Sequence, residues 1–110
     1  MNPPLTLFDK IWAQHVIVQR DGGEVLLHID RNLVHEGSFH AFGALAKEGR
    51  RVRKPRQTFA VADHYVPTAG RERGMAGVVD DEARGMIALL AAHAQANGIA
   101  HFGMDDARQG

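Results

Sequence analysis

Helical and strand patterns alternate along this chain, and the alternation constrains its fold more than any other feature. Apolar residues gather on one helical face in three segments, at 7–16, 39–46 and 80–97. Short apolar runs with β-branched or aromatic residues follow each of them, at 24–29, 58–62 and 99–103. This order predicts an α/β fold with a short, mostly parallel sheet and right-handed crossover connections.

Capping signals mark the ends of the predicted helices. Thr6 and Ser38 are candidate N-caps of the first two helices, and Asp9 is favourably placed in the first turn. Gly49 and Gly98 are placed to end the second and third helices, where glycine readily adopts a left-handed conformation. The capping signals therefore fall at the ends of the helices that the apolar spacing predicts.

The strands are expected to lie inside the fold. The run at 24–29 is typical of a strand buried on both faces, which would make His28 a hydrogen-bonded core residue. Residues 30–32 and 69–77 are predicted as loops, and 104–110 as a polar tail without a closing element. A parallel sheet of three strands needs cover on both faces, and no linker divides the chain. Residues 1–110 are thus predicted to be one incomplete part of a larger sheet domain.

Charge and composition exclude several classes of function. Thirteen basic residues balance thirteen acidic ones, so there is no electrostatic basis for nucleic acid or an anionic membrane as a partner. No stretch approaches the roughly 20 apolar residues of a membrane span, and the start does not resemble a signal peptide. We therefore expect a soluble, cytoplasmic protein. The absence of cysteine excludes disulfides, thiolate metal sites and cysteine nucleophiles within the chain.

The dipeptide Asp63-His64 is the sharpest candidate for chemistry, because it follows a predicted strand where α/β sheets bind ligands. A carboxylate beside an imidazole orients the ring and stabilises its protonated form, which favours a general acid near neutral pH. Neighbours on a regular strand point to opposite faces, so the pair works only if the strand ends at Asp63. Pro67 favours such an end. The alternative is that Asp63 caps the loop and His64 is an ordinary surface residue.

Other polar clusters indicate a functional site less clearly. His35-Glu36 also pairs an imidazole with a carboxylate, but a loop histidine is more often solvated than catalytic. The remaining histidines lack metal-ligand spacing, so no metal ligand is predicted. The basic segment 49–56 is most simply a solvated loop, with a subunit contact as the second interpretation. Nucleic acid binding comes last, because no aromatic residues interleave with the charges.

Six segments, in order, match the pattern of one known family: T-L-F-D-K-I-W, L-L-H-I-D-R-N-L-V-H-E, R-V-R-K-P, T-F-A, D-H-Y-V-P-T and D-A-R-Q-G. Together they resemble the large subunits of 3-isopropylmalate dehydratase, in the aconitase family. The opening T-L-F-D-K-I-W is similar to the start of those subunits, and L-L-H-I-D-R-N-L-V-H-E is similar to their L-L-Y-I-D-R-H-L-V-H-E. The segments R-V-R-K-P and T-F-A match as well. D-H-Y-V-P-T is close to the family's D-H-N-V-P-T, and D-A-R-Q-G to its D-P-R-Q-G. The resemblance covers essentially the whole chain, as the N-terminal part of such a subunit.

The resemblance implies an aconitase-like α/β/α domain and a hydro-lyase that interconverts 2-isopropylmalate and 3-isopropylmalate in leucine biosynthesis. It implies a [4Fe–4S] cluster that acts as a Lewis acid on the substrate. His64 matches the acid that helps the hydroxyl depart, Asp63 its partner, and His35 a substrate-contacting position that is Gln in the aconitases. The implied partners are a small dicarboxylate substrate, the rest of the large subunit, and a separate small subunit that supplies the base.

Departures from the family pattern leave alternatives open. Asn32 replaces a His, Tyr65 replaces an Asn, and residues 37–40 differ from the usual T-S-P-Q, so citraconate-like or homoaconitate-like diacids remain as substrates. In the family, the cluster cysteines and another active-site histidine lie beyond the position of Gly110. The chain alone is therefore predicted to bind no cluster and to be inactive. The competing hypothesis is a non-enzymatic remnant or interaction module that uses the basic segment or an open sheet edge.

Overall fold

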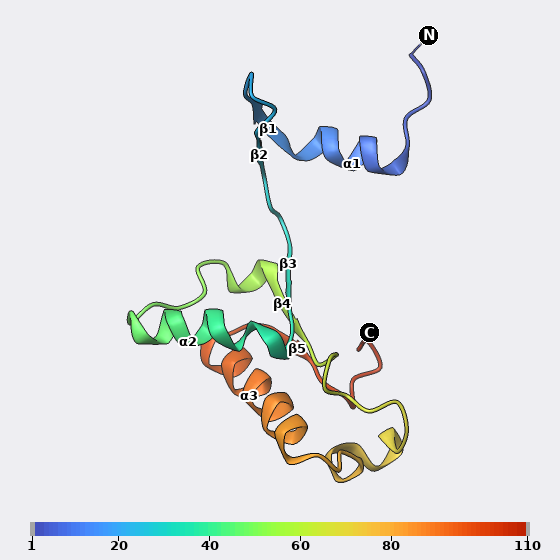
Figure 1. Ribbon diagram of the computed structural model, residues 1–110, viewed down its shortest axis with the longest axis vertical. Helices are drawn as coiled ribbons and strands as arrows, with labels where there is room; N and C mark the ends of the chain where they lie inside the picture. Colours follow the sequence, from blue (N-terminus) through green and yellow to red (C-terminus); the bar gives the residue numbers. More distant parts are fainter. Residues whose placement is uncertain (1, 110) are drawn as a thin grey trace. The chain divides into compact units, whose positions relative to one another are not determined.

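The computed structural model describes residues 2–109 (Figure 1). They form two compact units, an N-terminal unit that ends at Asp30 and a C-terminal unit that begins at Arg31. None of the described helices is both long and apolar enough to cross a membrane.

The N-terminal unit consists of one helix and a hairpin. Helix α1 (Leu7–His15) begins with a capping box, as predicted: the Thr6 hydroxyl accepts a hydrogen bond from the Asp9 amide, and the Asp9 carboxylate accepts one from the Thr6 amide. Strands β1 (Val16–Gln19) and β2 (Val25–Leu27) pair in the antiparallel direction. None of the residues of α1 is buried.

The prediction of a buried parallel strand at 24–29 is wrong. β2 is shorter than predicted, pairs only with β1 among the described strands, and leaves His28 exposed instead of in a core. The cause is the turn at residues 20–23, in which Gly23 adopts a φ of +85° and donates a hydrogen bond to the Arg20 carbonyl. A connection this short can only join antiparallel strands.

His15 is expected to make the N-terminal unit sensitive to pH. Its Nδ1 lies 2.6 Å from the Ile11 carbonyl oxygen and its Nε2 lies 3.2 Å from Asp30 Oδ2. The hydrogen bond to Ile11, and after it the one to Asp30, raises the pKa of His15 above its ordinary value of 6.5. The stabilisation is therefore fully present below pH 6.5 and is lost as the pH rises through the raised pKa.

Carbon chemical shifts of α1 in a pH titration measure this effect. Helical shifts should weaken as the pH rises, and the weakening should be absent in a His15→Gln variant, which keeps a neutral polar side chain. Helical shifts that are constant between acid and alkaline pH in the parent chain would contradict the assignment.

The C-terminal unit contains the predicted parallel sheet. Strands β3 (Asn32–Val34), β4 (Thr58–Val61) and β5 (Ala100–Phe102) lie in the order β3-β4-β5, and both pairs are parallel. The α/β prediction is thus confirmed, but its first strand is β3 and not the run at 24–29. Part of the predicted loop at 30–32 therefore belongs to the start of β3.

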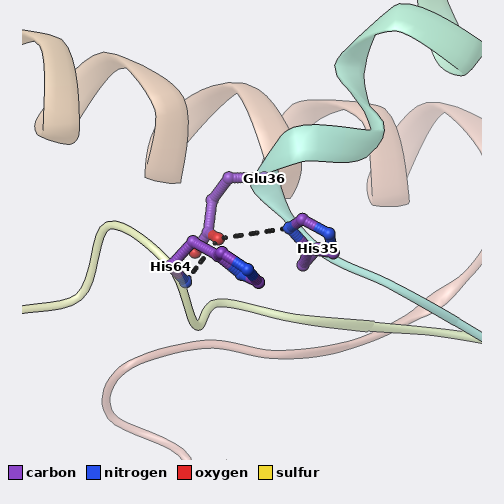
Figure 2. Close-up of side chains that lie close together, drawn as sticks. All are labelled: His35, Glu36 and His64. Carbon is purple, nitrogen blue, oxygen red and sulfur yellow. Dashed lines mark hydrogen bonds and ion pairs between the residues drawn. The ribbon is translucent and has the colours of Figure 1, made fainter.

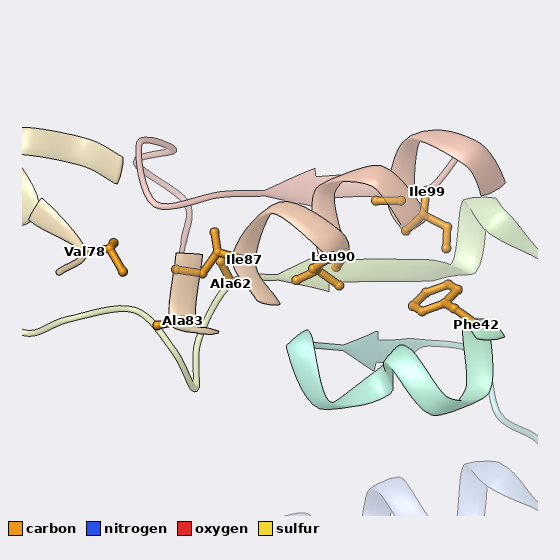
Figure 3. Close-up of a cluster of buried hydrophobic side chains, with 9 residues drawn as sticks. Phe42, Ala62, Val78, Ala83, Ile87, Leu90 and Ile99 are labelled. Carbon is orange, nitrogen blue, oxygen red and sulfur yellow. The ribbon is translucent and has the colours of Figure 1, made fainter. Parts of the chain in front are cut away.

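Helices α2 (Phe39–Lys47) and α3 (Asp81–Asn97) connect the strands and cover one face of the sheet. Both crossovers step across the sheet in the same direction, so right-handed connections place both helices on the same side. The core lies between them and the sheet (Figure 3), and its buried apolar members are Phe42, Ala60, Ala62, Val78, Ala83, Ile87, Leu90, Ala94 and Ile99. On the opposite face Leu33 is 73% exposed, and Phe59 stacks on Phe102 with ring centroids 6.3 Å apart.

The helix ends follow the capping signals with one exception. Asp80 caps α3 by accepting a hydrogen bond from the Ala83 amide, and Gly98 ends it with a φ of +67°. Gly49 likewise follows α2 with a φ of +68°. Ser38 stands at the N-cap position of α2 but does not cap it, because its hydroxyl accepts a hydrogen bond from the His35 amide instead.

Two segments predicted as irregular are more ordered than expected. Residues 69–77 contain two short 3₁₀ turns (η3, Arg71–Gly77) joined at Gly74. Further 3₁₀ turns precede α2 (η1, Glu36–Ser38) and β4 (η2, Pro55–Gln57). The tail after β5 folds back, and Gln109 donates a hydrogen bond to the Ala62 carbonyl at 2.5 Å. The tail is therefore attached to the end of β4.

Candidate active site

Two polar dipeptides meet beyond the carboxyl ends of neighbouring strands. His35 and Glu36 follow β3, while Asp63 and His64 follow β4. β3 and β4 are parallel and hydrogen-bonded, with Val34 opposite Ala60, so both strands end at the same edge of the sheet. The sequence-predicted site residues His35 and His64 are thus brought together (Figure 2), and Asp63 lies beside His64.

Asp63 and His64 form the expected pair. Asp63 Oδ2 lies 3.2 Å from His64 Nδ1. β4 ends at Val61, so the two side chains are free of the alternation that would place them on opposite faces. The His64 side chain is 58% exposed. This contact between Nδ1 and the carboxylate orients the ring and leaves Nε2 for a substrate.

His35 lies against His64 as a stacked ring. The ring centroids are 4.0 Å apart and the planes are inclined by 20°. His35 Nδ1 accepts a hydrogen bond from the Gly37 amide at 3.0 Å, which places the proton of the neutral ring on Nε2. Gly37 also leaves room for the ring, because a Cβ there would lie 2.6 Å from His35 Cε1. The neutral ring of His35 therefore carries its proton on Nε2, while His64 turns its Nδ1 toward the Asp63 carboxylate.

Glu36 is the member of the site that sequence reasoning missed. The residue is 1% exposed, and its carboxylate accepts hydrogen bonds from the backbone amides of Asp63 at 2.5 Å and His64 at 2.9 Å. Glu36 Oε2 also lies 4.0 Å from His35 Nδ1. The partners are backbone groups 27 and 28 residues away, so the sequence offers no local signal for this contact.

His35, Glu36 and His64 also have the residue types of a metal site. One potential ligand atom from each residue lies within 4.8 Å of the others. However, Nδ1 of His35 already accepts a hydrogen bond from the Gly37 amide, and the Glu36 carboxylate accepts hydrogen bonds from two backbone amides. A metal at His35 Nε2 would require the opposite tautomer. These hydrogen bonds therefore make the three residues a poor fit for a metal ion.

The tail supports the same strand end. Gln109 Oε1 accepts a hydrogen bond from Arg71 at 2.5 Å while its Nε2 donates to Ala62. Hydrogen bonds from the Arg108 side chain and amide lower the pKa of Asp106 to about 2. The Arg108 guanidinium lies 4.8 Å from the centre of the Phe102 ring. The turn at 106–108 is thus fixed by charge and ring contacts close to the end of β5.

An open hollow of about 230 Å³ adjoins the paired histidines. It is lined by Leu33, Val34, His35, Val61 and Asp63, so it combines apolar walls with the polar groups of the site. A larger hollow of about 560 Å³ lies beside α2 and includes His35 and His40 together with Arg50 and Arg53 of the basic segment. His35 borders both, which places it at a position that a small anionic molecule can reach.

The basic segment is partly engaged by the fold. Arg51 donates to the Ala96 carbonyl at the end of α3, and Arg50 pairs with Glu48 at 3.1 Å. A subunit contact, the second interpretation of this segment, stays a prediction.

The sequence profile of the aconitase family (aconitate hydratase) matches residues 9–110. No solved structure matches the chain.

Proposed function

Because the chain belongs to the aconitase family, we propose that its C-terminal unit supplies the proton donor and a substrate-binding group of a hydro-lyase active site. Family membership itself indicates a hydro-lyase type of function. The observation that carries the proposal is the pairing of Asp63 with His64, whose exposed ring stacks on His35.

Loss of water from a 2-hydroxy diacid needs an acid at the hydroxyl and a base at the neighbouring carbon. In the proposed reaction the C–O bond breaks as protonated His64 gives its Nε2 proton to the departing oxygen, which leaves as water. The proton on the neighbouring carbon goes to a base outside these residues, and the C–H electrons form the double bond. Asp63 keeps the ring oriented, and the Nε2–H of His35 donates to a substrate carboxylate.

The cofactor of the family does not fit these residues. Aconitase-family enzymes generally contain a [4Fe–4S] cluster, and such clusters are held by cysteine thiolates. The chain has no cysteine, and its cluster of nitrogen and oxygen donors is already hydrogen-bonded to the backbone. The part proposed for this chain is therefore proton donation and substrate contact alone.

The proposed substrate is 2-isopropylmalate, interconverted with 3-isopropylmalate in leucine biosynthesis. The similarity of residues 26–36 and 62–68 to the large subunits of that dehydratase supports this choice. The proposed partners follow from it: the remainder of a large subunit that holds the cluster, and a small subunit that provides the base.

A substrate panel tests this assignment. The gene product, purified without air from its source cell together with whatever chains accompany it, should form the unsaturated diacid fastest from 2-isopropylmalate. Citramalate, homocitrate and citrate serve as comparison substrates of the same reaction type. Faster turnover of one of these would move the assignment to a related dehydratase, and an iron-loaded preparation that dehydrates none of them would contradict the hydro-lyase proposal.

A further inference from the structure

One buried carboxylate binds both backbone amides that follow β4. Glu36 Oε1 accepts from the Asp63 amide and Oε2 accepts from the His64 amide, while the side chain is fully buried. Burying a charged carboxylate is costly unless hydrogen bonds compensate, and bonds to an ionised acceptor are stronger than neutral ones. The two consecutive amides are therefore held at one position by a single buried side chain.

The peptide group that carries the Asp63 amide is also held through its carbonyl oxygen. The ladder between β4 and β5 continues as far as the Ala62 amide, which donates to the Phe102 carbonyl at 3.2 Å. The Ala62 carbonyl then accepts from the Gln109 side chain. Beyond the Ala62 amide, the Ala62 carbonyl and the next two amides bond to side chains and no longer to a neighbouring strand.

This exchange of partners explains why Asp63 and His64 can form a pair. On a regular strand the two side chains would point to opposite faces of the sheet. Once Glu36 draws both amides toward itself, the chain leaves the strand conformation, and the Asp63 carboxylate lies 3.2 Å from His64 Nδ1. The geometry of the proposed acid thus depends on a residue that does not face the substrate.

We propose that Glu36 is a positioning residue that orients His64, with Gln109 as a second positioning residue on the opposite side. The catalytic consequence rests on the proposed function. The positioning itself does not, because the orientation and tautomer of His64 can be measured in the 110-residue chain without turnover.

The first test uses the parent chain. Scalar couplings across hydrogen bonds, measured by NMR, should connect the Asp63 and His64 amide nitrogens to the Glu36 carboxyl carbon. The bond from the Ala62 amide to the Phe102 carbonyl provides an internal control; at 3.2 Å it is longer than either bond to Glu36 and should give the weaker coupling. Detection of the control coupling without the two Glu36 couplings would overturn the proposal.

The second test uses Glu36→Gln, which keeps the shape of the side chain but replaces one acceptor oxygen with an amide donor. Imidazole nitrogen shifts should show a single Nδ1–H tautomer of His64 in the parent chain and a mixture of tautomers in the variant. Glu48→Gln is the matched control, because Glu48 is an exposed glutamate that pairs with Arg50. An unchanged His64 tautomer in a folded Glu36→Gln chain would show a purely structural role and overturn the proposal.

A third variant covers the case in which Glu36→Gln does not fold. Gln109→Met removes the hydrogen bond to the Ala62 carbonyl without leaving a charge buried. It should likewise give a mixture of His64 tautomers in place of a single Nδ1–H tautomer. No shift in a folded Gln109→Met chain would contradict the role of Gln109, and absent couplings would contradict that of Glu36. If these spectroscopic results hold while no diacid is turned over, the proposed function fails and the positioning role stands.

Discussion

His64→Ala is expected to slow diacid dehydration by about 10²- to 10⁴-fold, the usual contribution of a positioned general acid. The imidazole is the group placed to protonate the departing hydroxyl, while substrate contacts at His35 remain. The loss should therefore fall mainly on kcat and less on KM. Steady-state kinetics of the purified gene product measure both constants.

His28→Ala is the matched control for this prediction. It removes an exposed imidazole from the N-terminal unit and should leave turnover near that of the parent protein. Asp63→Asn should give a smaller loss than His64→Ala, because it weakens the orientation of the ring but keeps the proton donor. Near-normal kcat in a folded His64→Ala protein would contradict the assignment of the acid.

Leu90→Ala is expected to destabilise the chain by about 2–5 kcal/mol. Leu90 is 2% exposed and belongs to the core between α3 and the sheet, where truncation leaves a cavity. Its neighbour Leu89 is 38% exposed, and Leu89→Ala should cost about 1 kcal/mol or less. The chemical change and the helix are the same in both variants, so the difference reports burial alone.

Urea unfolding followed by circular dichroism measures the two free energies of unfolding. The Leu90→Ala midpoint should fall well below the Leu89→Ala midpoint at a similar slope. Equal losses in the two variants would mean that α3 does not present this face to the sheet.

Features that depend on local chemistry were predictable from the sequence. The ends of α3 follow from Asp80 and Gly98, whose capping geometries involve neighbouring residues only. The capping box of α1 is of the same kind. One condition for the pairing of Asp63 with His64 was also predictable, namely that β4 ends before Asp63.

Features that depend on distant partners were not predictable in this way. An apolar run such as 24–29 has the same pattern in a hairpin as in a central strand, so its burial could not be inferred from spacing. The acceptor role of Glu36 could not be inferred, because it depends on backbone amides, which carry no residue identity. The stacking of His35 on His64 likewise requires the parallel register of β3 and β4.

Chemical rescue tests the central claim, that His64 is the proton donor of a hydro-lyase, most directly. The His64 side chain is largely exposed, so its removal leaves a space that imidazole from solution can enter. Added imidazole should restore diacid turnover to His64→Ala in a saturable manner and should not accelerate the parent protein. A folded, iron-loaded His64→Ala protein that stays inactive at all imidazole concentrations would contradict the claim.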